Sequence, residues 1–221
     1  MISDFQRDGD GPRYHGVFAA IVTNIVDEAK LGRVELKFPW LGKAGEAVRA
    51  WATLLTPYAD DDQGFFVLPA VHTQVVVAFE AGDLRRPYVL GACWNGKEKP
   101  PEVAQKPNDK RLIKTRSGSL LEFDDKDGAA KVTLSMKSGH RLVLEDSGNT
   151  VTLQHSGGSV IVLEASGKIT IEAKSDVDVH ATTLNVHAPE ANFDNKINCV
   201  TLTASGSVVS PSYAIGAGNQ W

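Results

Sequence analysis

The chain has 221 residues, a hydrophobic fraction of 42% and a formal net charge of −4. This length accommodates one large domain or two small ones, and we expect two. The acidic balance offers no basic footprint for nucleic acid or for an anionic membrane, so neither is expected as a stable partner. No apolar run approaches the ~18 residues that span a bilayer, and the first residues lack the apolar core of a signal peptide.

The two cysteines, Cys93 and Cys199, lie in different halves of the chain. Neither belongs to a CxxC pair or to a regular cysteine framework. We therefore expect two free thiols in a reducing compartment.

The first half of the chain predicts a small β-barrel. Residues 1–13 are polar and rich in Asp and Gly, which is typical of a flexible arm. From residue 14 to 95 the chain carries strand-like runs separated by Gly and Pro, with no helical period. The runs are GVFAAIVTNIVD, GRVELKF, VRAWATLL, GFFVLPAVHTQVVVAFE and RPYVLGACW. Five or six antiparallel strands of this kind predict an OB-fold barrel, and most aromatic residues fall here.

A connector separates the barrel from a different architecture. Residues 96–111 contain Pro100, Pro101 and Pro107 at high charge density, which indicates a linker.

From residue 112 to 209 the chain repeats itself. Apolar residues recur as i, i+2 pairs, and the pairs follow one another at steps of seven to eleven residues with Gly, Ser, Asn and Asp between them. The pairs are Leu121/Phe123, Val132/Leu134, Leu142/Leu144, Val151/Leu153, Ile161/Leu163, Ile169/Ile171, Val177/Val179, Leu184/Val186, Ala191/Phe193 and Val200/Leu202. Each pair predicts one short strand with a single apolar face.

Strands this short, with only two apolar side chains each, cannot form a buried core from one chain alone. Two inward side chains contribute ~1.5 to 3 kcal/mol each when fully buried, whereas ordering each residue of the backbone costs about 1 to 2 kcal/mol. We therefore expect an intertwined, triple-stranded β-helix over residues 112–209, formed by an obligate homotrimer that leaves no free sheet edge. Its core is expected to contain Leu142, Leu144, Val151, Leu153, Ile169, Ile171, Val177, Val179, Leu184 and Val186.

The barrel segment and the repeats together resemble a known family, the central spike of contractile injection machines. The barrel carries, in order, WA, GFxxxP, GDxxxPYVLG and NGxxxPP at residues 51–101, and the shaft carries GKITIEAKSDVDVHATTLNVHAP. Both are similar to phage baseplate assembly protein V and to the valine-glycine repeat (VgrG) spike proteins of type VI secretion.

The resemblance implies a non-enzymatic, membrane-piercing spike that joins a separate hub protein to a tip protein of the proline-alanine-alanine-arginine (PAAR) type. Such a particle is assembled in the bacterial cytoplasm and is delivered to or through the envelope of a target cell, so its contact with the target membrane is transient. The sequence departs from some phage members, which end in an iron-binding HxH pair, because residues 210–221 contain no histidine. We accordingly expect no metal and no cofactor.

Two contact sites follow as hypotheses. Tyr213, Ala214, Ile215 and Trp221 are apolar near the chain end, which favours docking of the tip protein or capping of the rod. Asp83, Arg86 and Pro87 lie in a charged turn that serves either a hairpin or contact with the hub.

The other polar clusters favour solvent-exposed residues over metal sites. Asp60, Asp61 and Asp62 lack the remaining spacing of a calcium loop, so a solvated turn is expected. His180 and His187 are seven residues apart and fall on outward positions of the predicted strands, which favours exposed histidines over a metal site.

No nucleophile, metalloprotease or phosphate-loop motif occurs, so no residues support an enzyme. The alternative function is a glycan-binding or glycan-degrading phage-tail β-solenoid. It requires aromatic stacking and paired acids, but the repeats carry only Phe123, Phe193 and Tyr213 as aromatics before the terminus. A hexapeptide-repeat acyltransferase requires steps of six, and none occurs.

Overall fold

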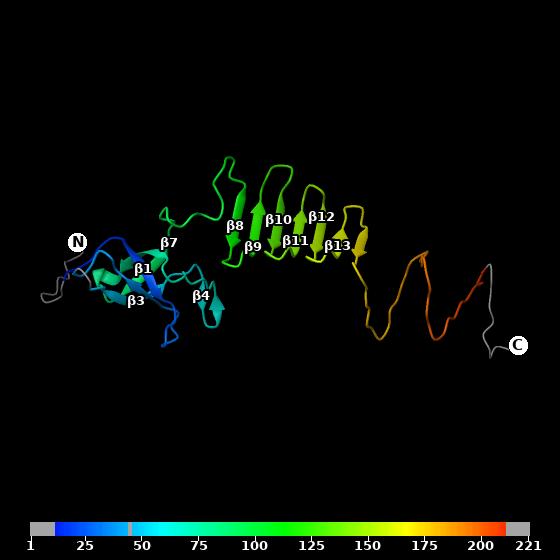
Figure 1. Ribbon diagram of the computed structural model, residues 1–221, viewed down its shortest axis with the longest axis horizontal. Coiled ribbons are helices and arrows are strands. Elements are labelled where there is room, and N and C mark those ends of the chain that lie inside the picture. Colours follow the sequence, from blue (N-terminus) through cyan, green and yellow to red (C-terminus); the bar gives the residue numbers. More distant parts are fainter. Residues whose placement is uncertain (1–11, 44–45, 211–221) are drawn as a thin grey trace, which may run out of the picture.

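A computed structural model of the chain describes residues 12–43 and 46–210. Within these ranges the protein consists of β-strands and one short 3-10 helix. The barrel lies at one end, an open sheet follows it, and residues 173–210 continue as an irregular chain (Figure 1). Among the described residues, none forms a helix with the length and apolarity needed to cross a bilayer.

The first unit is a closed five-stranded barrel. Its strands are β1 (Phe18–Asn24), β2 (Val34–Lys37), β3 (Arg49–Leu54), β6 (Gln74–Phe79) and β7 (Pro87–Ala92), in the order β1-β2-β3-β7-β6. All neighbours are antiparallel except β3 and β7, whose short parallel pairing aligns Thr53 with Tyr88 and closes the cylinder. The predicted barrel is confirmed with five strands, although its closure includes one parallel pair.

A strand-like run in the barrel segment does not become a strand throughout. GFFVLPAVHTQVVVAFE forms a strand at Gly64, the end of β5, and over β6, while residues 65–70 are irregular. Pro69 lacks an N–H and cannot donate to a sheet ladder, which limits strand formation in this stretch. Before it, the two-residue strands β4 (Ala59–Asp60) and β5 (Gln63–Gly64) form a hairpin with Asp61 and Asp62 in its exposed turn.

The barrel core follows from the period of two in its strands. Residues of β6 alternate between buried and half-buried along its whole length, and the other strands supply the same alternation. The core consists of Ala20, Val22, Val34, Leu36, Phe38, Ala52, Val75, Val77, Phe79 and Val89. Nine of the ten are 0% exposed, so this unit buries its apolar side chains without help from another chain.

An aromatic cluster covers one side of this core. Phe18 stacks on Trp40 with ring centroids 4.8 Å apart, and Tyr14 and Phe79 pack around them. The indole N–H of Trp40 donates to the carbonyl of Ala19 at 2.8 Å, so the polar end of the ring is satisfied. The concentration of aromatics before residue 95 thus corresponds to a conventional core.

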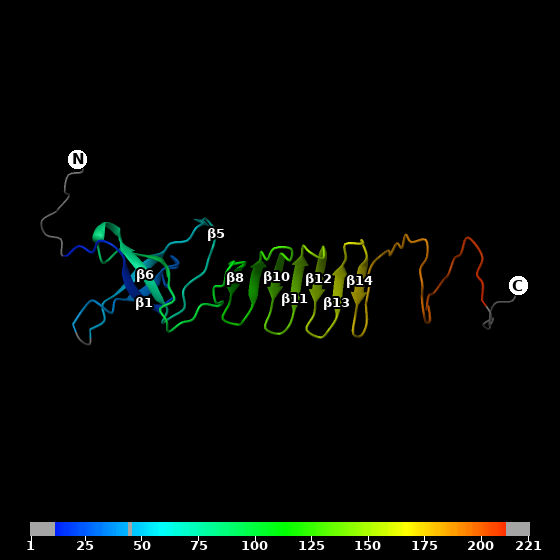
Figure 2. The same cartoon turned by 90° about the horizontal axis from the view of Figure 1, so that it is seen from above.

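The second unit is a seven-stranded antiparallel meander. It contains β8 (Lys110–Lys114), β9 (Leu120–Asp124), β10 (Lys131–Ser135), β11 (Arg141–Glu145), β12 (Thr150–Gln154), β13 (Val160–Leu163) and β14 (Ile169–Glu172), paired in chain order. The strands stack side by side along the long axis of the molecule (Figure 2). The six apolar pairs from Leu121/Phe123 to Ile169/Ile171 each lie on their own strand, as predicted, while β8 starts inside the predicted linker.

The meander differs from the expected winding. Each strand exchanges hydrogen bonds with its sequence neighbours, for example Leu142 opposite Leu153 and Leu144 opposite Val151. The backbone is therefore paired within one chain over residues 110–172, and the expected intertwining of chains is not shown for this part. The cause is the short turn after every strand, which returns the chain directly beside itself.

Residues 173–210 form no strand. The predicted strands at Val177/Val179, Leu184/Val186, Ala191/Phe193 and Val200/Leu202 are not paired with any described part of the chain, and every residue from 174 to 210 is exposed. The segment runs away from β14 in broad zigzags (Figure 1).

Candidate assembly surfaces

One face of the meander is an uncovered apolar surface, which we call the apolar face. Directly opposed residues share a face of an antiparallel sheet, so the register assembles two columns. One column runs through Leu121, Leu134, Leu142, Leu153, Ile161 and Ile171, and the other through Phe123, Val132, Leu144, Val151, Leu163 and Ile169. Leu153 is 51% exposed and Ile169 63% exposed, although their alternation is that of a buried face.

The opposite face of the meander carries more polar side chains, although Thr133 at its centre is buried. It carries the cross-strand ion pairs Lys110–Glu122, at 3.7 Å, and Lys131–Asp124, at 3.9 Å. Its central column contains Thr133, Val143 and Thr152, which lie directly opposite one another. The difference between the two faces sets the direction in which the sheet must be covered.

Apolar side chains are also uncovered in the segment after β14, and to a greater extent. Val177, Val179, Leu184 and Val186 are all more than half exposed, as are the apolar residues that follow them up to Val209. Because this segment forms no ladder, its backbone also lacks regular partners. These residues, and those of the apolar face, include all ten positions predicted for the trimer core.

The barrel has an apolar groove of its own. Leu54, Leu55, Phe65, Val67 and Val89 line a hollow of about 260 Å³. Phe66 and Trp94, which are 76% and 66% exposed, add to the apolar surface of the same unit. Exposed aromatics of this size are typical of protein contacts.

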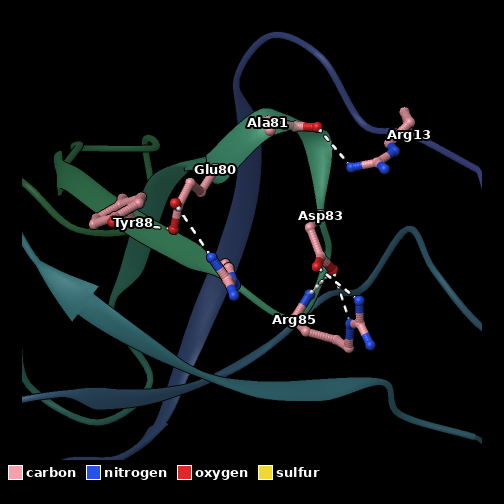
Figure 3. A network of polar contacts seen from close by, with 7 residues as sticks. Arg13, Glu80, Ala81, Asp83, Arg85 and Tyr88 are labelled. Atoms are coloured by element: carbon pink, nitrogen blue, oxygen red, sulfur yellow. Dashed lines mark hydrogen bonds and ion pairs between the residues drawn. The ribbon is translucent and has the colours of Figure 1, made fainter. Parts of the chain in front are cut away.

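The turn that contains Asp83 lies between β6 and β7 and is held by a polar network (Figure 3). The helix η1 (Glu80–Gly82) opens it, and the guanidinium of Arg85 donates two hydrogen bonds to the Asp83 carboxylate, at 3.0 and 2.9 Å. Arg86 pairs with Glu80 at 3.3 Å. Together these contacts fix the turn and leave the arginines at the surface.

The N-terminal side of the barrel closes over the same turn. Tyr14 donates its backbone N–H to the carbonyl of Gly82 at 3.0 Å, and Arg13 donates to the carbonyl of Ala81 at 3.1 Å. Gly82 is buried with φ of +77°, and a Cβ there would approach Tyr14 N to 3.1 Å. The Gly-Asp pair of the motif is therefore required by local structure.

Electrostatics in this turn favour a charged carboxylate. The side-chain hydrogen bonds from Arg85 hold the pKa of Asp83 at about 2, with further help from the backbone N–H of Arg85. Sequence reasoning named Asp83, Arg86 and Pro87 here but missed Arg85. Pro87 is fully buried in the barrel, whereas the side chain of Arg86 is exposed, so the structure places only part of this set on the surface.

The remaining predicted sites give no chemical centre. His180 and His187 are exposed, and within the described ranges no cluster of three or more His, Cys, Asp or Glu side chains is arranged to hold a metal ion. Cys93 and Cys199 are free and exposed. Tyr213, Ala214, Ile215 and Trp221 lie outside the described residues.

One contact near the turns of the meander was missed by sequence reasoning. The rings of His140 and His155 lie 4.6 Å apart between centroids, and the N–H of Ser156 donates to His140 Nδ1 at 3.3 Å. Both histidines occupy turns that the register places on the same edge of the sheet. The repeat spacing of the turns could have revealed this proximity.

Comparison with known proteins assigns the barrel to a family. Residues 18–94 match the model of the type VI secretion system/phage-baseplate injector OB domain. The matched range begins with β1 and ends just after β7, so it coincides with the closed barrel.

Curated relatives extend the match beyond the barrel length. The chain is 26% identical over 110 residues to the actin cross-linking toxin VgrG1 of Vibrio cholerae, covering 47% of this chain and 10% of that protein. It is 23% identical over 121 residues to the type VI secretion system spike protein VgrG3 of Vibrio cholerae, covering 52% and 12%. It is 27% identical over 138 residues to the spike protein VgrG2a of Pseudomonas aeruginosa, covering 58% and 16%.

The matched regions are thus between 10% and 16% of the length of these relatives. The barrel matches an injector OB domain, and the chain is also similar to spike proteins of type VI secretion systems from two organisms. On these matches residues 18–94 are similar to the injector OB domain, and the chain is similar over about half its length to VgrG-type spike proteins.

Proposed function

We propose that this protein is the central spike of a contractile injection system or phage-tail baseplate. In this proposal three copies of the chain form a stiff shaft along the tube axis, and the function is mechanical. The observation behind it is the apolar face of β9–β14, which has the alternation of a core and no cover from the described residues of its own chain. A homotrimer covers it most simply, since three equivalent sheets turned inward enclose one apolar axis.

The shaft has two parts in this proposal. Over residues 110–172 each chain contributes a complete meander, so three sheets pack by their apolar faces as the sides of a prism. Over residues 173–210 the backbone itself needs partners, and the chains intertwine so that the legs of one chain pair with those of its sisters. The triple-stranded β-helix expected from the repeats is thereby assigned to the second part.

The two ends of the spike are assigned to partners. We assign Tyr213, Ala214, Ile215 and Trp221 to docking of a PAAR-like tip protein, on their apolar character. The hub protein is assigned to the barrel, where the exposed Arg86 beside Asp83 offers a charged contact. In use the shaft then passes through the envelope of a target cell by force of sheath contraction, with no catalytic step.

The assembly state tests the core of this proposal. The purified chain should sediment at three times 23.8 kDa. Leu153→Asp should abolish the trimer, because it places three carboxylates in an apolar core, whereas Gln154→Asp on the other face of the same strand should leave the mass unchanged. A wild-type mass near one chain contradicts the proposal, as does equal behaviour of the two variants.

The tip assignment has a separate test. A chain ending at Ser210 should lose at least 10-fold in affinity for a co-expressed PAAR-like protein, because the three apolar ends form the centre of the contact. Binding of undiminished strength by the truncated trimer would remove the tip from residues 211–221. The truncated chain must first be shown to remain trimeric, so that loss of the shaft is not mistaken for loss of the tip.

The relatives lend no support to the glycan-binding or glycan-degrading alternative, and the described meander presents Phe123 as its sole aromatic side chain.

A further inference from the structure

The turns of the meander lie along two sides of the sheet, at the two ends of its strands, and these two sides, here called edges, carry different charges. One edge is formed by the turns after β8, β10 and β12, which we call the basic edge (residues 114–119, 136–141 and 155–159). The other is formed by the turns after β9, β11 and β13, which we call the acidic edge (residues 124–130, 145–149 and 164–168). Antiparallel connection in chain order places alternate turns on opposite edges.

The basic edge contains no Asp or Glu. Its charged residues are Lys114, Arg116, Lys137 and Arg141, with His140 and His155 beside them. None of these four cations has an ion-pair partner among the described residues of the chain. The edge therefore presents positive charge that its own chain does not neutralise.

The acidic edge has the reverse balance. Asp124, Asp125 and Glu164 are paired within the chain, with Lys131, Arg111 and Lys168 respectively. Asp127, Glu145 and Asp146 have no ion-pair partner within the described ranges, and Lys126 offsets one of these charges. A negative surplus remains along this edge, centred on the turn after β11.

We infer that the basic edge of one chain packs against the acidic edge of the next chain around the trimer. This inference rests on the proposed trimeric shaft. A closed three-fold ring uses head-to-tail contacts, so the surface that one copy offers to its neighbour differs from the surface it receives. The meander supplies two such surfaces of opposite charge at opposite ends of the same strands.

The heights of the turns along the axis agree with this packing. Neighbouring strands lie about 4.8 Å apart, so turns on one edge repeat about every 9.6 Å and turns on the other edge are offset by about 4.8 Å. Rotation about an axis parallel to the stack of strands preserves these heights. The basic turn 136–141 of one copy therefore falls between the acidic turns 124–130 and 145–149 of its neighbour.

The contact has two consequences for assembly. Lys137 and Arg141 of one chain meet Asp127, Glu145 and Asp146 of the next, so the edge pairs select the vertical register of the three chains. The apolar columns alone would tolerate a shift by two strands, because the same side-chain types recur along the axis. Charged turns at the corners make such a shift costly and so specify one alignment.

Charge reversal with compensation tests the inference in the full chain. Lys137→Glu with Arg141→Glu, and separately Glu145→Lys with Asp146→Lys, should each raise the trimer dissociation constant by about 100-fold at low salt, because three contacts change together. The chain that carries all four substitutions should return to within about threefold of wild type, since its edges are complementary again. At about 1 M salt the differences should shrink, because the screening length falls to about 3 Å.

The matched control is Lys97→Glu with Lys99→Glu, which changes the net charge equally in the linker before the meander. It should leave the dissociation constant unchanged. Failure of the four-fold variant to recover stability, or an equal effect of the linker control, overturns the edge pairing. A wild-type chain that is itself monomeric overturns the spike proposal, so the two failures are distinguishable.

Cross-linking tests the geometry without reversing charge. In a chain with Cys93→Ser and Cys199→Ser, the pair Lys137→Cys and Asp146→Cys should yield covalent trimers on oxidation. Within one chain these positions lie at opposite ends of β11, about 17 Å apart, which is beyond the reach of a disulfide. Either cysteine alone should give no covalent trimer. Absence of covalent trimers from the double-cysteine chain overturns the inference.

Discussion

The barrel and the meander use the same local pattern and reach opposite results. In both units apolar and polar residues alternate along short antiparallel strands. The barrel closes through the parallel pairing of β3 with β7 and buries ten apolar residues in one core. The meander stays open and leaves Leu144 and Ile171 about half exposed. Closure of the sheet, and not the pattern itself, decides whether one chain is sufficient for a core.

This contrast separates the information in the sequence into two kinds. The barrel residues specify a core that is complete in one copy, whereas the meander residues leave an apolar face exposed, which the proposed function assigns to other copies. Under the proposed function such a division helps assembly on a hub, because the barrel would be folded before three chains meet. The division also predicts that the two units respond differently to dilution and to mutation.

The largest expected effect comes from separating the units. A fragment of residues 12–95 should fold as a monomer, with an unfolding midpoint that does not depend on protein concentration. A fragment of residues 96–221 should fold only as a trimer, with a midpoint that rises with concentration. Circular dichroism melts at several concentrations, together with sedimentation, measure both properties.

The outcome that would break the comparison is a shaft fragment that stays folded as a monomer. A barrel fragment that trimerises as tightly as the full chain would instead move the assembly interface to the groove near Leu55 and Phe65. Either result would require a different account of the uncovered apolar face.

The sequence predicted the strands of the two units better than the way in which each sheet pairs or closes. The pairs from Leu121/Phe123 to Ile169/Ile171 identified six strands because spacing of two is a local property. The structure does not show the intertwining expected over the whole shaft, and it pairs residues 110–172 within one chain, since whether a turn returns a strand beside its own chain or passes to a sister depends on turn geometry. The parallel pairing of β3 with β7 is also non-local and leaves no mark in either strand.

The residues of the candidate contact sites could also be predicted only in part. Asp83 was identified from its motif, but its partner Arg85 was not, because the side chain that reaches a carboxylate two residues away depends on the turn. Pro87 was named for either a hairpin or a hub contact and is buried at the start of β7, since a strand-initial proline can face either way. The charge on the two edges is visible in sequence only after the turns are assigned to alternate sides.

A smaller effect is expected from the barrel core. Phe38 is fully buried against Phe79 and Trp40, with centroids 5.6 and 5.9 Å from its own ring. Phe38→Ala should lower the free energy of unfolding of the barrel by about 3 to 5 kcal/mol. The mass of the trimer should not change, because the shaft carries assembly. Chemical denaturation followed by tryptophan fluorescence measures the first effect and sedimentation the second; loss of the trimer would contradict the independence of the units.

The smallest effect concerns the loop between β1 and β2. Asp27 accepts two hydrogen bonds from Arg33, both at 2.9 Å, and two from the backbone N–H groups of Ala29 and Leu31. These contacts, led by the Arg33 side chain, hold the pKa of Asp27 well below the ordinary carboxyl range. A pKa that is lower in the folded state stabilises the fold above the ordinary pKa, and this stability is lost as the pH falls through the folded value.

Asp27→Asn should therefore lower the melting temperature of the barrel at neutral pH, by less than Phe38→Ala does. The difference in melting temperature between Asp27→Asn and wild type should shrink as the pH falls from about 5 toward about 1. Asp62→Asn is the matched control, because Asp62 lies in the exposed turn of the β4–β5 hairpin. Melting curves of the full chain across this pH range give the comparison. A difference that stays constant with pH would show that Asp27 acts on the loop through shape alone, and a comparable loss in Asp62→Asn would remove the role of the Arg33 pair.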